Sequence, residues 1–174
     1  MSPNGLFLVF TGEGKGKTTA ALGQALRAAG HGMRVLILQF IKGSWHYGEL
    51  EAVKRLPTVT LEPLGRGFTW KKESLEEDRR LAQRGWEKAR QALLSGSHDL
   101  IILDELNNVL AYGLLDVHRV VDDIRRRRPS CHVVATGRGA PRELVREADC
   151  VTEMIAVKHH YHTQGVRAQK GIEF

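Results

Sequence analysis

The stretch that decides the fold is Thr11 to Thr19, TGEGKGKTT, which directly follows the apolar run LFLVF at residues 6–10. Its glycines allow backbone dihedrals that turn successive N–H groups inward. A helix that starts within the stretch adds the partial positive charge of its N-terminus, and the lysines add full charges. A strand, a glycine–lysine loop and a helix in this order predict a polyphosphate-binding site.

The loop closely follows the phosphate-binding pattern G-x-x-x-x-G-K-[ST], although Thr11 occupies the position of the first glycine. The pattern assigns Lys17 to phosphate oxygens and the Thr18 hydroxyl to Mg²⁺. It does not choose between hydrolysis, phosphoryl transfer and another reaction of the nucleotide.

Apolar stretches of strand length alternate with helical patterns along the chain. Most of the stretches are apolar throughout, as in strands covered on both faces: residues 6–10, 34–40, 59–61, 100–103, 133–136 and 150–155. Helices are expected at residues 18–29, at 75–94 behind a capping box of Ser74 and Glu77, and from an Asp116 cap to Pro129. The alternation predicts one α/β domain over residues 1–174, P-loop NTPase-like, with a mostly parallel central sheet of about six strands and helices on both faces.

The composition is that of an ordinary globular protein, with 42% hydrophobic and 26% charged residues among 174. There is no apolar run of about 18 residues and no secretion signal at the N-terminus, so we expect a cytoplasmic protein without a membrane partner. Cys131 and Cys150 lie in or beside apolar runs and are predicted to be buried free thiols.

The net charge of +6 favours anionic ligands, but residues 125–128 supply four of the positive charges at one predicted helix end. The charge therefore does not single out nucleic acid. We interpret this arginine run as solvated surface, opposite the edge of the sheet that binds ligands.

Ligands of such sheets bind at the carboxyl ends of the strands. The run LIILDEL ends in Asp104 and Glu105, a Walker-B-like pair that indicates a Mg²⁺ site, without showing which acid contacts the ion. Lys42 follows the second predicted strand, where it is either a solvated lysine or a phosphate contact. Arg138 lies between two glycines after the fifth predicted strand, and we favour it as an anion contact.

The segment PLGRGFTW follows the third predicted strand and carries Phe68 and Trp70 two residues apart. The rings are either part of the core or an aromatic wall for a large, flat ligand, and their place in a glycine-flanked loop favours the wall. His159, His160 and His162 in the C-terminal tail do not have the spacing of a zinc site.

Together, these segments resemble the P-loop family of ATP:corrinoid adenosyltransferases. The resemblance covers residues 5–174 and is carried by FTGEGKGKTTAA, QFIKGSWHYGE, GFTW, DEL, TGRGAPREL and VKHHYHTQGVRAQKGIEF. It implies that Co(I) of a corrinoid such as cobalamin attacks the 5′ carbon of ATP and expels triphosphate, in adenosylcobalamin biosynthesis or salvage. It also implies Mg²⁺ dependence, a homodimer and an electron-donor flavoprotein as a possible partner.

The resemblance implies roles for individual residues. ATP is expected to bind Gly12, Glu13, Gly14, Lys15, Gly16, Lys17, Thr18, Thr19, Lys42 and Arg138, and Mg²⁺ to bind Thr18, Asp104 and Glu105. Phe68 and Trp70 are expected to pack beneath the corrin ring and displace its lower axial ligand, which makes them, with Lys17, the residues expected to act in catalysis.

Other members of the family can carry an N-terminal helical segment that helps to cover the site, whereas only Met1 to Gly5 precede the first predicted strand here. We expect the C-terminal tail or a partner subunit to shield the corrinoid instead. The alternative function is that of a P-loop ATPase or small-molecule kinase, which releases ADP and not triphosphate.

Overall fold

A six-stranded, entirely parallel sheet forms the centre of the molecule, with strand order β3-β2-β4-β5-β1-β6. The computed structural model describes residues 4–43, 47–65 and 75–174. The strands are β1 (Phe7–Thr11), β2 (Val35–Gln39), β3 (Val59–Pro63), β4 (Leu100–Asp104), β5 (His132–Thr136) and β6 (Cys150–Glu153). The predicted fold class is therefore confirmed.

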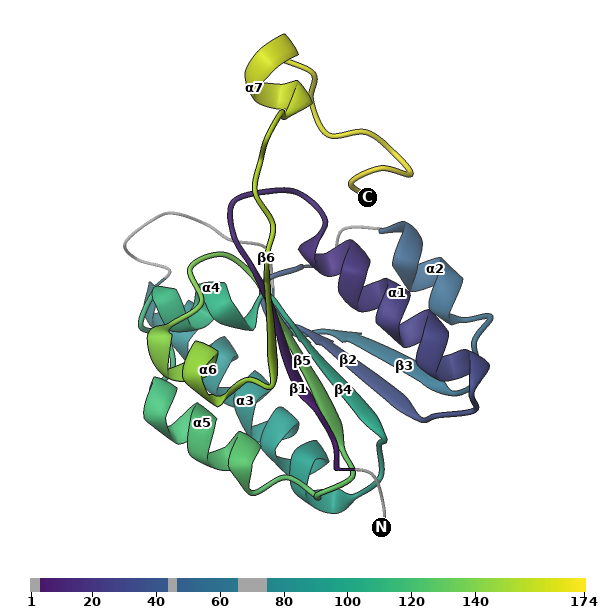
Figure 1. Ribbon diagram of the computed structural model, residues 1–174, viewed down its shortest axis with the longest axis vertical. Helices are drawn as coiled ribbons and strands as arrows, with labels where there is room; N and C mark the ends of the chain where they lie inside the picture. The colour runs from purple at the N-terminus through teal and green to yellow at the C-terminus, as the bar shows by residue number, and fades with distance from the viewer. Residues whose placement is uncertain (1–3, 44–46, 66–74) are drawn as a thin grey trace.

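Helices cover both faces of the sheet, as Figure 1 shows. On one face lie α1 (Lys17–Gly30) and α2 (Gly48–Val53), and on the other lie α3 (Leu75–Ser95), α4 (Leu106–Ala111), α5 (Val117–Arg125) and α6 (Arg142–Glu147). The chain then leaves β6, forms α7 (His160–Gln164) beyond the sheet and turns back (Figure 1). The short helices α2, α4 and α7 were not predicted.

The strands β1, β2, β4 and β5 send alternate side chains into two separate apolar cores. In β4, Ile101 and Leu103 pack with the layer of α3 and α5, and Leu100 and Ile102 pack with α1. Because both faces bury apolar groups, the central strands read as continuous apolar runs and not as alternating ones. Because all six strands are parallel, their carboxyl ends lie at one edge of the sheet.

The prediction for Cys150 is wrong. Cys131 is buried, but Cys150 is an exposed free thiol at the start of β6. All four residues of β6 are exposed because this strand lies at the edge of the sheet and pairs only with β1 among the described strands. An apolar run therefore does not by itself place a strand in the interior.

The predicted helix ends agree with the structure to within a few residues. The Asp116 carboxylate accepts hydrogen bonds from the backbone N–H groups of His118 and Arg119, so Asp116 is the N-cap of α5. Pro141, which follows the fifth predicted strand, was expected to be the first residue of a helix, but it precedes α6 as its N-cap. Ser74, predicted to cap α3, lies outside the described residues.

The arginine run lies at the amino ends of the strands. Arg127 donates hydrogen bonds to the carbonyl oxygens of Gly5 and Cys131, which precede β1 and β5. Arg128 donates to the Gly96 carbonyl, and Arg125 pairs with Glu147 at 2.7 Å. The arginine run therefore lies at the edge opposite the phosphate loop, as expected, but Arg125, Arg127 and Arg128 join elements of the fold and are more than solvated surface.

Candidate active site

The phosphate loop connects β1 to α1 and packs against the end of β6. The Gly14 N–H donates to the Met154 carbonyl over 2.6 Å. Gly12 has a φ of 94°, and a Cβ atom there would lie 2.4 Å from the same carbonyl oxygen. Gly16, with a φ of 118°, is the N-cap of α1. Only glycine fits these two positions, which explains the density of glycine in the loop.

Lys17, the first residue of α1, points its ammonium group back into the loop. Its Nζ donates to the carbonyl oxygens of Gly12 and Gly14, at 2.7 Å each. The side chain is only 8% exposed. Burial lowers the pKa of Lys17, and the positive charge of Arg138 lowers it further. The loop thus already surrounds a cation at the place where phosphate is expected.

Asp104, at the carboxyl end of β4, is 1% exposed and accepts several hydrogen bonds. Its Oδ1 accepts from the Thr18 hydroxyl at 2.8 Å and from the Thr136 hydroxyl at 2.7 Å. Its Oδ2 accepts from the Gln39 amide at 3.1 Å. The structure therefore joins the two predicted metal ligands Thr18 and Asp104 through a direct contact.

Glu105 differs from its neighbour in both conformation and surroundings. It lines the cavity, and its φ of 64° is the only positive φ of a non-glycine residue among the described residues. Its N–H donates to the Thr136 hydroxyl at 3.0 Å. Burial raises the pKa of Glu105, and the charge of Asp104 adds to the increase. Strained backbone of this kind costs about 1–3 kcal/mol and is concentrated at functional sites.

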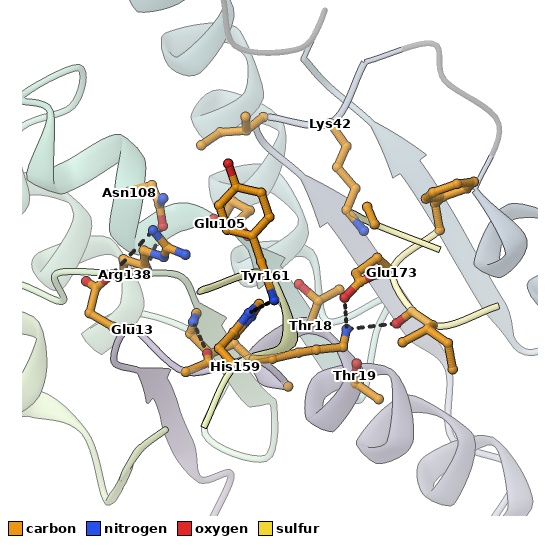
Figure 2. A pocket seen from close by; sticks show the side chains of 18 of the residues that line it. Glu13, Thr18, Thr19, Lys42, Glu105, Asn108, Arg138, His159, Tyr161 and Glu173 are labelled. Carbon is orange, nitrogen blue, oxygen red and sulfur yellow. Dashed lines mark hydrogen bonds and ion pairs between the residues drawn. The ribbon is translucent and has the colours of Figure 1, made fainter. Parts of the chain in front are cut away.

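Arg138 and Glu13 face each other across the mouth of the loop. Their side chains pair at 3.3 Å, and both are mostly exposed. The Arg138 N–H donates to the Asn108 side-chain oxygen at 2.6 Å. Figure 2 shows this group on one side of the pocket and Lys42 on the other. Asn108 was not predicted as a site residue, because its contact with Arg138 spans 30 residues.

Lys42 extends from the end of β2 toward α2. Its Nζ lies 2.5 Å from Glu49 Oε1 and 3.9 Å from Asp104 Oδ2. Burial alone would raise the pKa of Glu49, but hydrogen bonds from Lys42, from its own backbone N–H and from Gln39 bring it below the usual value. Lys42 is thus not a solvated loop lysine, and Glu49 was missed by the sequence reasoning.

The C-terminal tail forms the remaining wall of the cavity. Lys15 of the phosphate loop donates to the Ile172 carbonyl at 2.7 Å and lies 3.8 Å from the Glu173 carboxylate. His160 lies 3.2 Å from the same carboxylate, and its ring stacks on that of His159 at 4.6 Å. We expected the tail or a partner subunit to cover the site, and in the structure the tail lines the cavity that contains the loop.

The cavity has a volume of about 1330 Å³. It is lined by predicted ATP-binding residues, by the tail and by Glu49, Asn108 and Tyr112. Drug-sized ligands occupy pockets of about 300–1,000 Å³, so this space exceeds what a nucleotide needs. Of the predicted site residues, Phe68 and Trp70 lie outside the described residues. Across residues 4–43, 47–65 and 75–174, no three His, Cys, Asp or Glu side chains gather as a metal site.

Fold and site define a nucleotide-binding protein of the phosphate-loop type, and two solved structures share its fold. The flagellar accessory protein FlaH of Methanocaldococcus jannaschii has a TM-score of 0.59 at 13% identity, over 87% of this chain and 71% of that chain. The KaiC-like protein PH0186 of Pyrococcus horikoshii has a TM-score of 0.52 at 13% identity, over 88% of this chain and 72% of that chain.

The chain belongs to the ATP:corrinoid adenosyltransferase BtuR/CobO/CobP family, whose sequence model matches residues 3–174. A corrinoid adenosyltransferase of Pseudomonas aeruginosa is 44% identical over 98% of this chain and 84% of its own length. A corrinoid adenosyltransferase of Escherichia coli K12 is 41% identical over 98% of this chain and 86% of its own length. One from Salmonella typhimurium, named CobA, is 39% identical over the same shares of the two chains. These matches confirm the resemblance to the ATP:corrinoid adenosyltransferases that the sequence motifs indicated.

Proposed function

We propose that the protein transfers the 5′-deoxyadenosyl group of ATP to the Co(I) centre of a corrinoid and releases triphosphate. The observation that carries the proposal is the preformed phosphate loop at the wall of a cavity larger than a nucleotide requires. Such a cavity leaves room for a second substrate next to the sugar end of ATP. Membership of the family supports the same reaction.

In the proposed step, an electron pair of Co(I) forms a bond to C5′, and the C5′–O bond breaks. The bonding pair leaves with the triphosphate, whose charge grows as the bond breaks. Lys17 would exchange the Gly12 and Gly14 carbonyls for phosphate oxygens. Loop N–H groups other than that of Gly14, which donates to Met154, would contact the same oxygens. Charge on the leaving group is thereby stabilised in the transition state. No acid–base catalyst is needed, because Co(I) is already a strong nucleophile.

The residues at the end of β4 fit a magnesium ion. Thr18 and Asp104 are in contact, and Gln39 Oε1 beside them is a buried acceptor without a hydrogen-bond partner among the described residues. Mg²⁺ commonly binds through one or two protein oxygens, with water and phosphate completing its shell. Thr18 and Asp104 would hold the ion, which would neutralise charge on the triphosphate, and Glu105 at the cavity wall would lie near it.

On the corrinoid side, we propose that Phe68 and Trp70 displace the lower axial ligand of the corrinoid. β3 ends at Pro63, at the same edge of the sheet as the phosphate loop, and Phe68 and Trp70 follow five and seven residues later in the sequence. Removing an axial donor makes Co(II) easier to reduce, and a flavoprotein would supply the electron.

We further propose a cytoplasmic homodimer. No helix within the described residues is long and apolar enough to cross a membrane. The edge strand β6 is exposed, and the apolar side chains that follow it are exposed too, with Ile155 at 73% and Val157 at 94%. Unpaired edges and clustered apolar groups favour association, so a second copy would cover this surface.

The function is tested by mixing the protein with ATP, Mg²⁺ and chemically generated cob(I)alamin. The proposal predicts a light-sensitive Co–C product and an equal amount of triphosphate. Formation of ADP without a Co–C product would instead indicate an ATPase or kinase. A reaction without protein serves as the control.

A further inference from the structure

The Lys42 ammonium and the Gln39 amide each lie near both carboxylates, Glu49 and Asp104, at the β2 side of the cavity. Lys42 Nζ lies 2.5 Å from Glu49 and 3.9 Å from Asp104. Gln39 Nε2 lies 3.4 Å from Glu49 and 3.1 Å from Asp104. The Lys42 ammonium also lies 4.7 Å from the centre of the Tyr47 ring. Lys42 is therefore held from three sides, by two carboxylates and one aromatic face.

The Glu49 carboxylate is unexpected at the wall of a cavity proposed to bind phosphate. The side chains of Glu49 and Lys42 are only 14% and 17% exposed, so theirs is not a loose surface pair. The negative charge of Glu49 also opposes binding of a polyphosphate in the same cavity. A residue that merely lined the cavity would bind phosphate better without this charge.

The flexibility of lysine supplies the explanation. Its long stem loses rotamer freedom when the ammonium group is fixed on a ligand. A contact that already restricts the side chain in the free protein reduces this loss on binding. Glu49, at the start of α2, supplies such a contact, and Gln39 ties the same carboxylate to Asp104.

We propose that Glu49 is a positioning residue that holds the Lys42 ammonium at the cavity wall, ready for the triphosphate of ATP. The inference rests on the proposed function, because it takes Lys42 to contact that triphosphate. The proposal predicts that the effect of losing Glu49 on phosphate binding depends on whether Lys42 is present. With Lys42 present, loss of Glu49 weakens phosphate binding. With Lys42 absent, the same loss removes only a repulsive charge and strengthens binding slightly.

The test is a double-mutant cycle read by calorimetry, with inorganic tripolyphosphate and Mg²⁺ as the probe. The proteins are the full chain, Glu49→Ala, Lys42→Ala and the double variant. We expect Glu49→Ala to weaken binding about 5-fold in the presence of Lys42, a size typical of coupled neighbours, and to leave binding unchanged or tighter in its absence. Glu51→Ala is the matched control: Glu51 lies on the same helix, and its carboxylate pairs with Lys54 at 2.7 Å. It should leave binding unchanged.

Tighter binding of Glu49→Ala in both backgrounds would overturn the inference, because Glu49 would then only repel phosphate. Equal weakening in both backgrounds would also overturn it, because the role would then be general support of the fold. If Glu49→Ala does not fold, Glu49→Gln replaces it in the cycle with the same expected signs and a smaller loss of about 2-fold. The readout does not depend on adenosyl transfer. A protein that binds tripolyphosphate but forms no Co–C bond would refute the proposed function and leave this inference standing.

Discussion

Replacing Thr136 by valine tests whether the site is held together by the hydrogen bonds at the end of β5. Thr136 is fully buried, donates to Asp104 at 2.7 Å and accepts from the Glu105 N–H at 3.0 Å. Valine keeps the shape of the side chain but makes neither bond. A hydrogen bond to a charged group contributes about 1.5–3 kcal/mol, and a buried unsatisfied group costs about 1–3 kcal/mol. We therefore expect Thr136→Val to lower the free energy of unfolding by about 3 kcal/mol.

The assay is urea unfolding, with the affinity for Mg·ATP measured in parallel. Thr136→Ser keeps the hydroxyl and should recover most of the stability, whereas Thr60→Val, at an exposed position of β3, should change it by less than about 0.5 kcal/mol. Mg·ATP should bind Thr136→Val more weakly, because Asp104 loses a donor that orients it. If Thr136→Val matched the parent protein in both measurements, our account of how the two acids are held would be refuted.

Three further predictions concern the loop, the aromatic segment and acid stability. Lys17→Ala should lower the rate of adenosyl transfer about 100-fold or more, measured as Co–C formation at saturating ATP, because a leaving-group contact is lost; an unchanged rate would exclude that role. Trp70→Ala should spare transfer to preformed Co(I) but slow reduction of bound Co(II), and equal losses in both assays would contradict the displacement of the axial ligand. The Arg34 guanidinium and backbone N–H hold the pKa of Asp99 at about 2, so the stability contributed by this pair is present above about pH 4 and is lost as pH falls toward 2. Solvent screening limits this contribution to about 1 kcal/mol, and Asp99→Asn should remove that part of the acid dependence of unfolding; the same pH dependence in the variant would disprove it.

The strands, the long helices and the phosphate loop could be predicted because their signals are local. Apolar runs, helical periodicity and the glycine–lysine spacing each lie within a few residues of chain. The edge of the sheet to which the loop belongs follows from the parallel topology. Two of the roles that were missed depend on distant contacts, whereas Glu49 lies only seven residues from Lys42, on the short helix α2 that was not predicted. Thr136 meets Asp104 across 32 residues, and Asn108 meets Arg138 across 30.

Three features could not be predicted from the sequence, each for its own physical reason. Burial of Cys150 depends on which strand lies beside β6, and a single strand does not reveal its neighbours. The helices α2, α4 and α7 have only five or six residues each, too few for a clear periodicity. Asp104 and Glu105 look equivalent in the sequence. In the structure they differ because Asp104 accepts a hydrogen bond from Thr18 and Glu105 has a positive φ.

The central claim is that the glycine–lysine loop anchors a departing triphosphate while a C–O bond breaks at the sugar. It is tested most directly with ATP that carries ¹⁸O in the bridge between C5′ and the α phosphorus. After reaction with cob(I)alamin, mass spectrometry of the products locates the label. Our account predicts that the label leaves with the triphosphate. Label retained on a nucleoside or nucleotide product would show that a P–O bond had broken, and would contradict it.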